Sequence, residues 1–419
     1  MDDDNEESYL SLAIVLIGVA SLIMSGLRLD ILWMIVSVFY LGLMYGVYKI
    51  EVLEKDRYKF YLLKKNLFLW TFLPLLLGAS GFARVIDFYF IFRSIFFAIV
   101  VSILSFMVIL NLDHHTSFRP NFSFTIIFMV LFTIASAIIL EISRFISDQL
   151  LGTEMLEGNL HFMSDLVWIT IFSTCIVRFF KQYIKKAYSP GLERIKIDFR
   201  TTVKKRDHRG DFVKLLNSAF AEYDRPWLLT VSRGLQAGIA GVAVYGVMIG
   251  NSIIAGWSLF SLMVTLFPDI ISRDREQDFS TLYYFWISLV LFLYSFGRPI
   301  GFYGLFDLWP EITHFLSGSI VAMLVFFVLI QLTKVSETLY IQSWIIPLLV
   351  VIFMFPVGAV WEIGEFFFDL SFGTSLQASL DDTVADLISN VFGALFSMGI
   401  AYRFFPDWIW DPSENIEDL

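Results

Sequence analysis

The sequence predicts an all-α integral membrane protein with about twelve transmembrane helices, arranged as two parallel six-helix repeats. Its composition, its apolar stretches and an internal similarity lead to this fold class. Hydrophobic residues form 57% of the 419 and charged residues only 17%, whereas soluble domains carry about 45–50% apolar and about 25% charged residues. A chain this apolar, with a mean hydropathy of +0.70, is expected to have lipid as its solvent.

The expected spans follow from the length of helix that crosses a bilayer. About 20 residues of helix cross the hydrocarbon core, so a run of roughly 18 predominantly apolar residues indicates a span. In the first half such runs lie near residues 9–26, 31–49, 67–80, 88–111, 123–147 and 160–180. In the second half they lie near 227–248, 253–269, 280–297, 311–333, 343–368 and 380–404.

Four segments are expected along the chain. They are an N-terminal repeat at 1–180, a basic linker at 181–226, a C-terminal repeat at 227–404 and an acidic tail at 405–419. The linker's basic charge indicates anionic lipid head groups as its partner, and no motif beside it indicates nucleic acid. Apolar linker residues at helical spacing predict a helix on the membrane surface, formed by Phe212, Leu215, Leu216, Phe220 and Tyr223.

The distribution of charge between loops predicts the orientation of the chain. Lysine and arginine gather in the loops at 49–66 and 270–279 and in the linker, whereas the alternate loops carry acids such as Asp148 and Asp369. The positive-inside rule then places both termini and the linker in the cytoplasm. We therefore expect a multi-pass protein of the cell membrane. The run Asp113, His114, His115 falls in an expected cytoplasmic loop.

Two stretches of the sequence resemble each other without a gap. EISRFISDQLLGT begins at Glu141 and EIGEFFFDLSFGT begins at Glu362, and the offset between these two residues also relates Asp165 to Asp386. Upstream, GFARVID from 81 matches GFYGLFD from 301, with an offset that is shorter by a single position. Six expected helices separate equivalent spans, so equivalent helices cross the membrane in one direction, which makes the repeat parallel rather than inverted.

Ionisable residues inside the expected spans converge in the C-terminal repeat. One span begins with Glu311 and His314, the next ends with acids, and the last opens with acids and an amide; these residues are Glu362, Glu365, Asp369, Asp382, Asp386 and Asn390. Their spacings of three and four residues place them on shared helix faces. Ionisable groups in lipid are costly and usually mark function. We predict a polar site of His314, Glu362, Glu365, Asp382, Asp386 and Asn390 near the outer surface.

Several chemistries remain open for such a site. Carboxylates and imidazole at these spacings can ligate a divalent metal, and the predicted ligands are His314, Glu362 and Asp386. The same groups can shuttle protons or act as general acid and base on a lipid head group. They can also be satisfied polar contacts that hold three helices together. The sequence does not decide whether the protein is an enzyme.

The first half of the chain lacks part of this set. At the positions equivalent by the offset of Glu141 to Glu362, Arg144 stands in place of Glu365 and His161 in place of Asp382. Arg144 is expected to neutralise Glu141, which indicates a supporting copy that has lost the site. The acids of the second half have no such basic residue at these positions, and this favours the second half as the working half.

The C-terminal stretch resembles the VanZ-like and YjdF-like integral membrane proteins. The resemblance covers about residues 305–405 and rests on HFLSG from His314, on EIGE from Glu362 and on DDTVADLISNVFGA, which contains Asp382, Asp386, Asn390 and Gly393. Asp307 lies farther ahead of the histidine than is usual in that group. The resemblance implies a cell-envelope setting and supports the same site residues, but it implies no reaction.

The leading functional hypothesis is an outward-facing polar site that binds or processes a lipid or a cell-envelope component, with membrane lipid as partner and a divalent metal as the possible cofactor. The first alternative is a proton- or ion-coupled transporter, since parallel six-plus-six repeats occur in a major transporter class. The acids lie in one half and near one surface, which counts against it. The second alternative is a structural membrane protein without catalytic activity.

Overall fold

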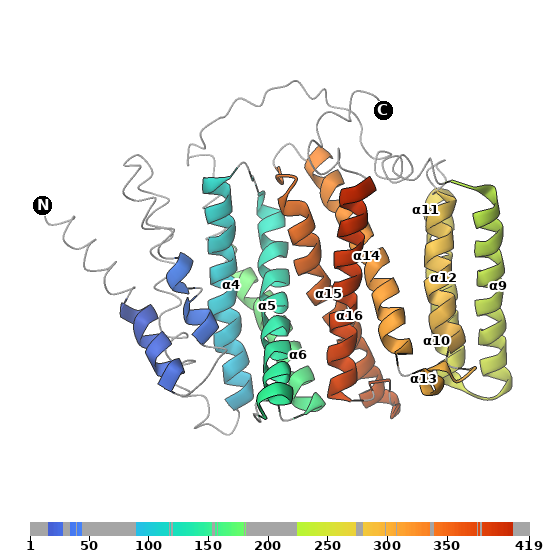
Figure 1. Cartoon of the computed structure of the whole chain (residues 1–419), viewed down its shortest axis with the longest axis horizontal. Coiled ribbons are helices and arrows are strands. Elements are labelled where there is room, and N and C mark those ends of the chain that lie inside the picture. The colour runs from blue at the N-terminus through green and yellow to red at the C-terminus, as the bar shows by residue number, and fades with distance from the viewer. Residues whose placement is uncertain are drawn as a thin grey trace, which may run out of the picture. The chain divides into compact units, whose positions relative to one another are not determined.

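The computed structural model describes residues 16–27, 34–43, 89–181, 224–273, 280–335 and 339–404, except 39, 117, 119, 153–155, 157, 180, 298, 307, 375 and 378. Every regular element in these ranges is a helix (Figure 1). After short helices at Leu16–Leu27 and Met34–Leu43, the elements are α4 (Tyr89–His115), α5 (Phe122–Leu151), α6 (Asn159–Phe179), α9 (Pro226–Met248), α10 (Ser252–Thr265), α11 (Phe267–Arg273), α12 (Thr281–Gly297), α13 (Phe302–Leu305), α14 (Trp309–Val335), α15 (Ile345–Phe372) and α16 (Leu380–Phe404).

Within the described residues, six helices are long and apolar enough to cross a membrane: α5, α6, α9, α14, α15 and α16. An all-helical, multi-pass membrane character is therefore confirmed. The expected number of twelve spans and their two repeats stay predictions, because α10, α12 and the described apolar parts of the first helices are shorter than a span requires.

One expectation about a loop is wrong. Asp113, His114 and His115 form the last turn of α4, so the helix continues past the end of its apolar run. Other expectations lie outside the described residues: the span near 67–80, the basic loop at 49–66, Asp307, the acidic tail and the surface helix of the linker.

The described helices fall into two compact units, each of which is described by itself. The first unit contains α4, α5 and α6 together with residues 355–383, which form the second part of α15 and the start of α16. The second unit contains α9 to α14, residues 343–354, which include the first part of α15, and α16 from residue 384 onward. The boundary between the units therefore runs through two continuous helices.

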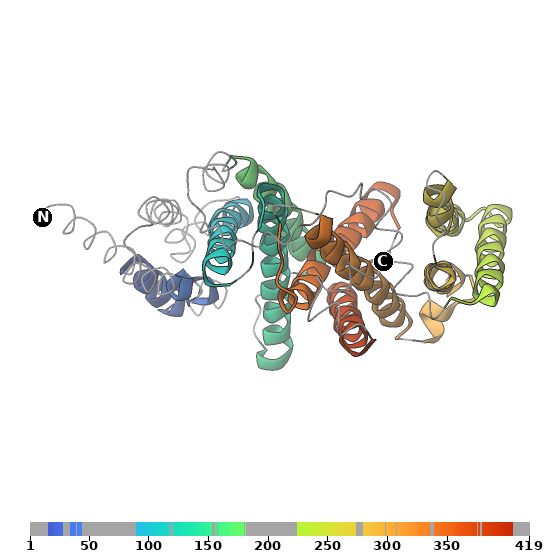
Figure 2. The ribbon, with the colours of Figure 1, turned by 90° about the horizontal axis from the view of Figure 1, so that it is seen from above.

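In the first unit, α4, α5 and α6 pack against one another (Figures 1 and 2, cyan to green). Buried hydroxyl groups join them: Ser102 Oγ lies 3.1 Å from Thr133 Oγ1 between α4 and α5, and Ser94 Oγ donates to Asp165 Oδ1 at 2.9 Å between α4 and α6. Small polar side chains of this kind are common where membrane helices pack, because they replace solvent as hydrogen-bond partners.

Helices α5 and α15 end in the same way. Each is followed by a glycine in the left-handed conformation, Gly152 with φ of 64° and Gly373 with φ of 63°. The amide of Gly152 donates to the carbonyl of Asp148, and the amide of Gly373 donates to that of Asp369. A side chain with a Cβ atom is strained in this conformation, so glycine is the residue that allows the chain to leave the helix here.

The two aspartates also hold the chain that follows each glycine. The Asp148 carboxylate accepts the backbone N–H of Leu156 at 2.9 Å. The Asp369 carboxylate accepts the backbone N–H groups of Leu376 and Gln377 at 2.8 and 3.0 Å. Asp148 and Asp369 are equivalent positions of the two similar stretches, and so are Leu156 and Gln377. The similarity of the two sequence stretches is thus matched by a common device for turning from one helix into the next.

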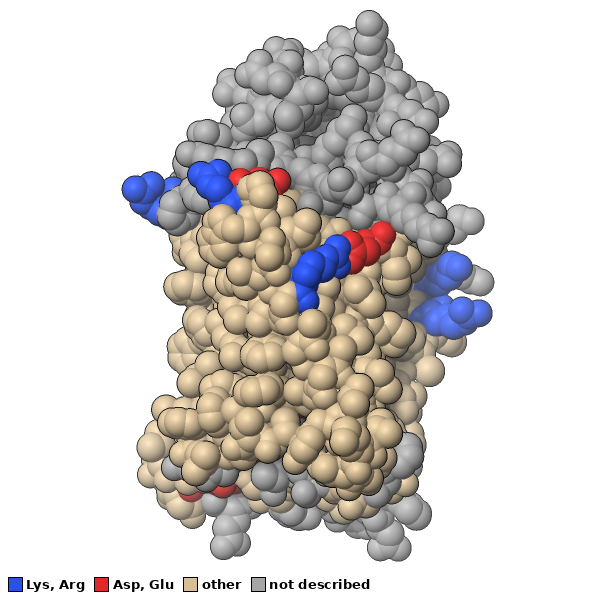
Figure 3. Space-filling view, turned by 90° about the vertical axis from the view of Figure 1, so that its right-hand side faces the viewer, with Lys and Arg blue, Asp and Glu red and all other residues tan. Residues whose placement is uncertain are grey.

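In the second unit, α9 packs against both α10 and α12, and α12 also packs against α14. Close approach of α9 and α10 depends on Gly246, where an added Cβ would lie 2.5 Å from the Ala255 backbone nitrogen. Figure 3 shows the face that α9 presents: a broad uncharged band with charged side chains toward one end of the helices. A broad uncharged band with charged side chains beyond its end is the surface expected for helices in lipid.

A charged pair lies at the edge of this unit. Arg233 on α9 binds both carboxylate oxygens of Asp269 on α11 at 2.7 Å, and its guanidinium lies 5.3 Å from the centre of the Tyr284 ring. The hydrogen bond from Arg233 holds the pKa of Asp269 below its ordinary value. Both side chains are partly exposed, so the pair contributes little to stability.

Candidate functional site

Two glycines let α14 and α16 approach each other closely in the second unit. A Cβ atom added at Gly318 would lie 2.6 Å from the Asn390 carbonyl oxygen, and one added at Gly393 would overlap the Phe315 carbonyl oxygen. The Ser397 hydroxyl on α16 donates to the Ser319 carbonyl on α14 at 2.7 Å. Because glycine removes the side chain from the interface, the two backbones can nearly touch. At this crossing the second and third turns of α14 lie against the middle of α16.

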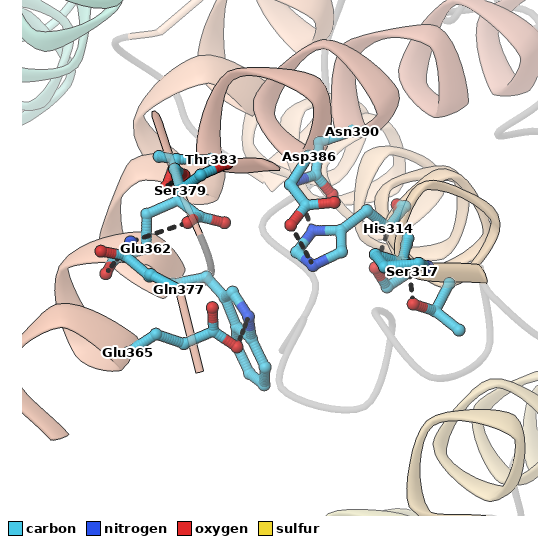
Figure 4. A network of polar contacts seen from close by, with 12 residues as sticks. His314, Ser317, Glu362, Glu365, Gln377, Ser379, Thr383, Asp386 and Asn390 are labelled. Carbon is cyan, nitrogen blue, oxygen red and sulfur yellow. Dashed lines mark hydrogen bonds and ion pairs between the residues drawn. The ribbon is translucent and has the colours of Figure 1, made fainter. Parts of the chain in front are cut away.

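At this crossing three of the predicted site residues meet. His314 Nε2 lies 3.4 Å from Asp386 Oδ2, and His314 Nδ1 lies 3.2 Å from Asn390 Nδ2. Figure 4 shows the His314 ring with Asp386 and Asn390 on neighbouring turns of α16. The three residues are 7%, 5% and 6% exposed, so they form a buried polar cluster.

The distance between His314 Nε2 and Asp386 Oδ2 can be compared with the distances expected for a hydrogen bond and for two ligands of one metal ion. A charge-assisted hydrogen bond between nitrogen and a carboxylate oxygen is usually about 2.7–2.9 Å long, which is shorter than the 3.4 Å found here. Two ligand atoms about 2.0–2.1 Å from one tetrahedral ion lie about 3.3–3.4 Å apart. The geometry of this pair therefore fits two ligands of one ion as well as a long ion pair.

Asn390 suits a histidine that changes its protonation pattern. In a neutral imidazole one ring nitrogen carries hydrogen and the other accepts. An amide can donate to His314 Nδ1 through its nitrogen, or accept from it through its oxygen after turning over. The second arrangement leaves the lone pair of Nε2 on the side of Asp386, where an ion would bind.

Other predicted site residues lie in the first unit. Glu362 is 1% exposed, and its Oε2 accepts a hydrogen bond from Gln377 Nε2 at 2.9 Å (Figure 4). Glu365 is 5% exposed, and its Oε1 accepts from the indole of Trp361 at 3.1 Å. Asp382 is half-buried in the first turn of α16.

Two acids that were not predicted as site residues lie at the end of α15 and at the start of α14. Asp369 holds the backbone N–H groups of Leu376 and Gln377, so its role is to shape the connection between α15 and α16. Glu311 lies in the first turn of α14, one turn before His314. Its Oε2 is buried without a hydrogen-bond partner among the described residues.

Gln377 is the residue that the sequence reading missed. It stands in a connection between helices, where helical spacing gives no information, and its counterpart in the first half is Leu156. A comparison of the two halves could have found it. Both halves keep an aspartate at the end of the helix, Asp148 or Asp369, but the residue eight positions later is Leu156 in the first half and Gln377 in the second.

The first half contains a counterpart of the site with different chemistry. By the two offsets of the repeat, upstream and downstream, Ser94 corresponds to His314 and Asp165 corresponds to Asp386. The Ser94 hydroxyl donates to the Asp165 carboxylate at 2.9 Å. The expected ion pair is also present, since Arg144 Nη1 lies 2.7 Å from Glu141 Oε1. In the first half, therefore, a hydroxyl group replaces the imidazole and a guanidinium faces the buried glutamate.

Residues 232–407 match the model of a family described as "Predicted membrane protein (DUF2238)". The match covers less than half of the chain and runs from α9 to the end of α16, so it contains all the predicted site residues. No curated protein and no solved structure matches the chain. The description agrees with the membrane character of the helices and names no activity.

Proposed function

We propose that the C-terminal half of the chain binds a divalent cation inside the membrane, through His314 and Asp386 with Glu362 as third ligand. The observation that carries the proposal is the 3.4 Å separation of His314 Nε2 and Asp386 Oδ2. Each of the three residues offers one buried donor atom of a kind that divalent cations take. Imidazole nitrogen with carboxylate oxygen suits zinc, manganese or iron(II).

A comparison of the two halves supports a cation at this site. The buried Glu141 faces the Arg144 guanidinium, whereas the residue at the position of Arg144 in the second half is Glu365. A set of buried carboxylates is stabilised by a nearby positive charge or by protonation, because burying ions in a medium of low dielectric is costly. A bound metal ion would supply in the second half the positive charge that arginine supplies in the first.

The site is proposed to serve a lipid or another envelope component that carries an anionic group. His314 and Asp386 lie in the first two turns of α14 and α16, which are long enough to cross a membrane, so they lie toward one membrane surface. A metal with three protein ligands keeps a position open for a ligand oxygen or water. In this arrangement Asn390 orients the imidazole, and Glu365 and Asp382 orient the ligands. The resemblance to VanZ-like and YjdF-like proteins supports an envelope setting.

We also propose that the chain crosses the cell membrane about twelve times as two parallel repeats, with cytoplasmic termini and linker. The common turning device at Gly152 and Gly373, with its aspartates, supports a duplication. A topology reporter inserted in the 181–226 linker is expected to respond as a cytoplasmic one. A periplasmic or extracellular response would contradict this orientation.

The cation proposal is tested with Co²⁺ as a probe on the full-length protein in lipid nanodiscs. The wild type is expected to bind one Co²⁺ with a visible absorption band and to melt at a higher temperature as Co²⁺ is added, because a ligand of the folded state stabilises it. Glu362→Gln and Asp386→Asn are each expected to weaken Co²⁺ binding by about 100-fold or more, since removing one ligand of three removes a large share of the affinity.

Asp165→Asn is the matched control, because Asp165 is the buried counterpart of Asp386 in the first half. It is expected to leave Co²⁺ binding unchanged. Equal binding by the wild type and by both ligand variants would reject the cation site. Gradient-dependent solute uptake by proteoliposomes that is lost in the same variants would instead favour a transporter over a lipid-directed site.

A further inference from the structure

We infer that Gln377 is a positioning residue that orients the Glu362 carboxylate, and that Asn159 of the N-terminal half holds Gln377 in place. The inference rests on the proposed cation site and adds to it a role for the first half of the chain. All the residues involved belong to the first compact unit, so the contacts are internal to that unit.

Both the nitrogen and the oxygen of the Gln377 amide form hydrogen bonds. Its Nε2 donates to Glu362 Oε2 at 2.9 Å and to the Glu362 carbonyl at 3.0 Å. Its Oε1 accepts from Asn159 Nδ2 at 3.1 Å. Asn159 Oδ1 in turn accepts from the Thr383 hydroxyl at 3.4 Å. Four residues, from α6, α15, α16 and the connection between the last two, thus form one line of hydrogen bonds that ends on Glu362.

The Glu362 carboxylate at the end of this line determines which group donates and which accepts in each hydrogen bond. An ionised carboxylate only accepts hydrogen bonds, so Gln377 must present its NH₂ group to Glu362. The oxygen of Gln377 then needs a donor, which Asn159 supplies. The Asn159 oxygen faces the Thr383 hydroxyl, whose single hydrogen is shared with the Ser379 carbonyl at 3.2 Å. Each amide has one orientation that satisfies both neighbours. The line therefore ends with an N–H group of Gln377 on the Glu362 carboxylate.

The backbone at Gln377 is fixed as well. Its N–H donates to the Asp369 carboxylate at 3.0 Å, so the residue cannot shift along the connection without losing this bond. With Oε2 held by Gln377, the Glu362 carboxylate is fixed in one orientation. Hydrogen bonds that orient a ligating carboxylate in this way commonly contribute 10–100-fold, roughly, to metal affinity.

The repeat supplies an internal comparison. The counterpart of Gln377 is Leu156, whose backbone N–H is bound by Asp148 in the same way but whose side chain cannot donate. The counterpart of Glu362 is Glu141, which is bound by Arg144 instead. The amide that binds the glutamate is therefore found in the half that is proposed to bind the ion, whereas in the other half the equivalent glutamate is bound by a guanidinium from the same helix.

The test measures Co²⁺ binding and the visible spectrum of bound Co²⁺ in the full-length protein. Gln377→Met keeps the length of the side chain but removes both polar groups of the amide, the NH₂ and the carbonyl oxygen. It is expected to lower the affinity about 10–100-fold and to change the Co²⁺ spectrum, because Glu362 is no longer held in one orientation. Asn159→Asp is expected to turn the Gln377 amide over, since the introduced carboxylate can only accept hydrogen bonds, and to lower the affinity by a smaller factor.

Gln149→Met is the matched control. Gln149 Nε2 donates to Asp381 Oδ1 at 3.3 Å, so it joins α5 to the start of α16 through an amide and a carboxylate without touching Glu362. It is expected to leave affinity and spectrum unchanged. Binding by Gln377→Met with the affinity and the spectrum of the wild type would overturn the positioning role alone. Absence of Co²⁺ binding by the wild type would overturn the cation site and the positioning role together.

Discussion

Replacing Arg144 with methionine is expected to destabilise the protein by about 3–5 kcal/mol. Arg144 and Glu141 are 8% and 3% exposed, and their charged atoms lie 2.7 Å apart. Methionine fills a similar length of space but carries no charge, so the glutamate stays buried without the cation that faces it. Removal of one partner of a buried pair costs far more than the pair itself contributes, because the remaining ion has lost its solvent and its counter-charge.

The double variant Glu141→Gln, Arg144→Met separates this effect from a loss of packing. It removes both charges and is expected to recover most of the lost stability. Unfolding by SDS in mixed micelles, followed by circular dichroism, measures the free-energy differences. If the single and double variants unfold at the same SDS fraction, the charge of Glu141 is not the cause.

Gly393→Ala is the second change with a large expected effect. The new Cβ atom would overlap the Phe315 carbonyl oxygen and lie 2.7 Å from the Ser319 backbone nitrogen. Both atoms belong to the backbone of α14, so no side chain can move away to relieve the contact. Overpacking typically costs about 1–3 kcal/mol, and the upper end is expected here. Because α14 carries His314, separation of the helices is expected to weaken Co²⁺ binding as well.

Gly399→Ala provides the comparison on the same helix. A Cβ at Gly399 meets nothing within 4 Å, and alanine is favoured over glycine inside a helix by about 1 kcal/mol. It is therefore expected to stabilise the protein slightly or leave it unchanged, with normal Co²⁺ binding. Equal stability of Gly393→Ala and Gly399→Ala in the same SDS titration would show that α14 and α16 do not depend on close backbone contact.

The helices of the described residues lie close to where the sequence predicts them. The run at 227–248 corresponds to α9 at Pro226–Met248, and the run at 380–404 corresponds to α16 at Leu380–Phe404. Apolar runs locate helices in lipid well, because every backbone polar group in the hydrocarbon must be paired internally. They do not locate the ends of helices in water, which is why α4 continues through Asp113, His114 and His115.

The site was predictable in part. Helical spacing selected Asp386 and Asn390 on one face of a helix, and the structure places both beside His314. Spacing could not separate an acid that faces a site from one that shapes a turn, so Asp369 appeared among the convergent acids although it binds backbone N–H groups. Spacing also carries no information in connections, where Gln377 lies. The contact of Gln377 with Asn159 depends on the folding of distant segments onto each other.

The composition of the first compact unit bears on how the chain can be divided. Residues 355–383 belong to that unit although they come from the second half of the sequence, and Asn159 and Gln149 contact them directly. A fragment cut in the 181–226 linker would lack this segment and expose the surface that normally receives it. The most natural place to divide the sequence is thus a poor place to divide the molecule, and chimaeras between relatives would need to exchange the ends of α15 and α16 along with the N-terminal helices.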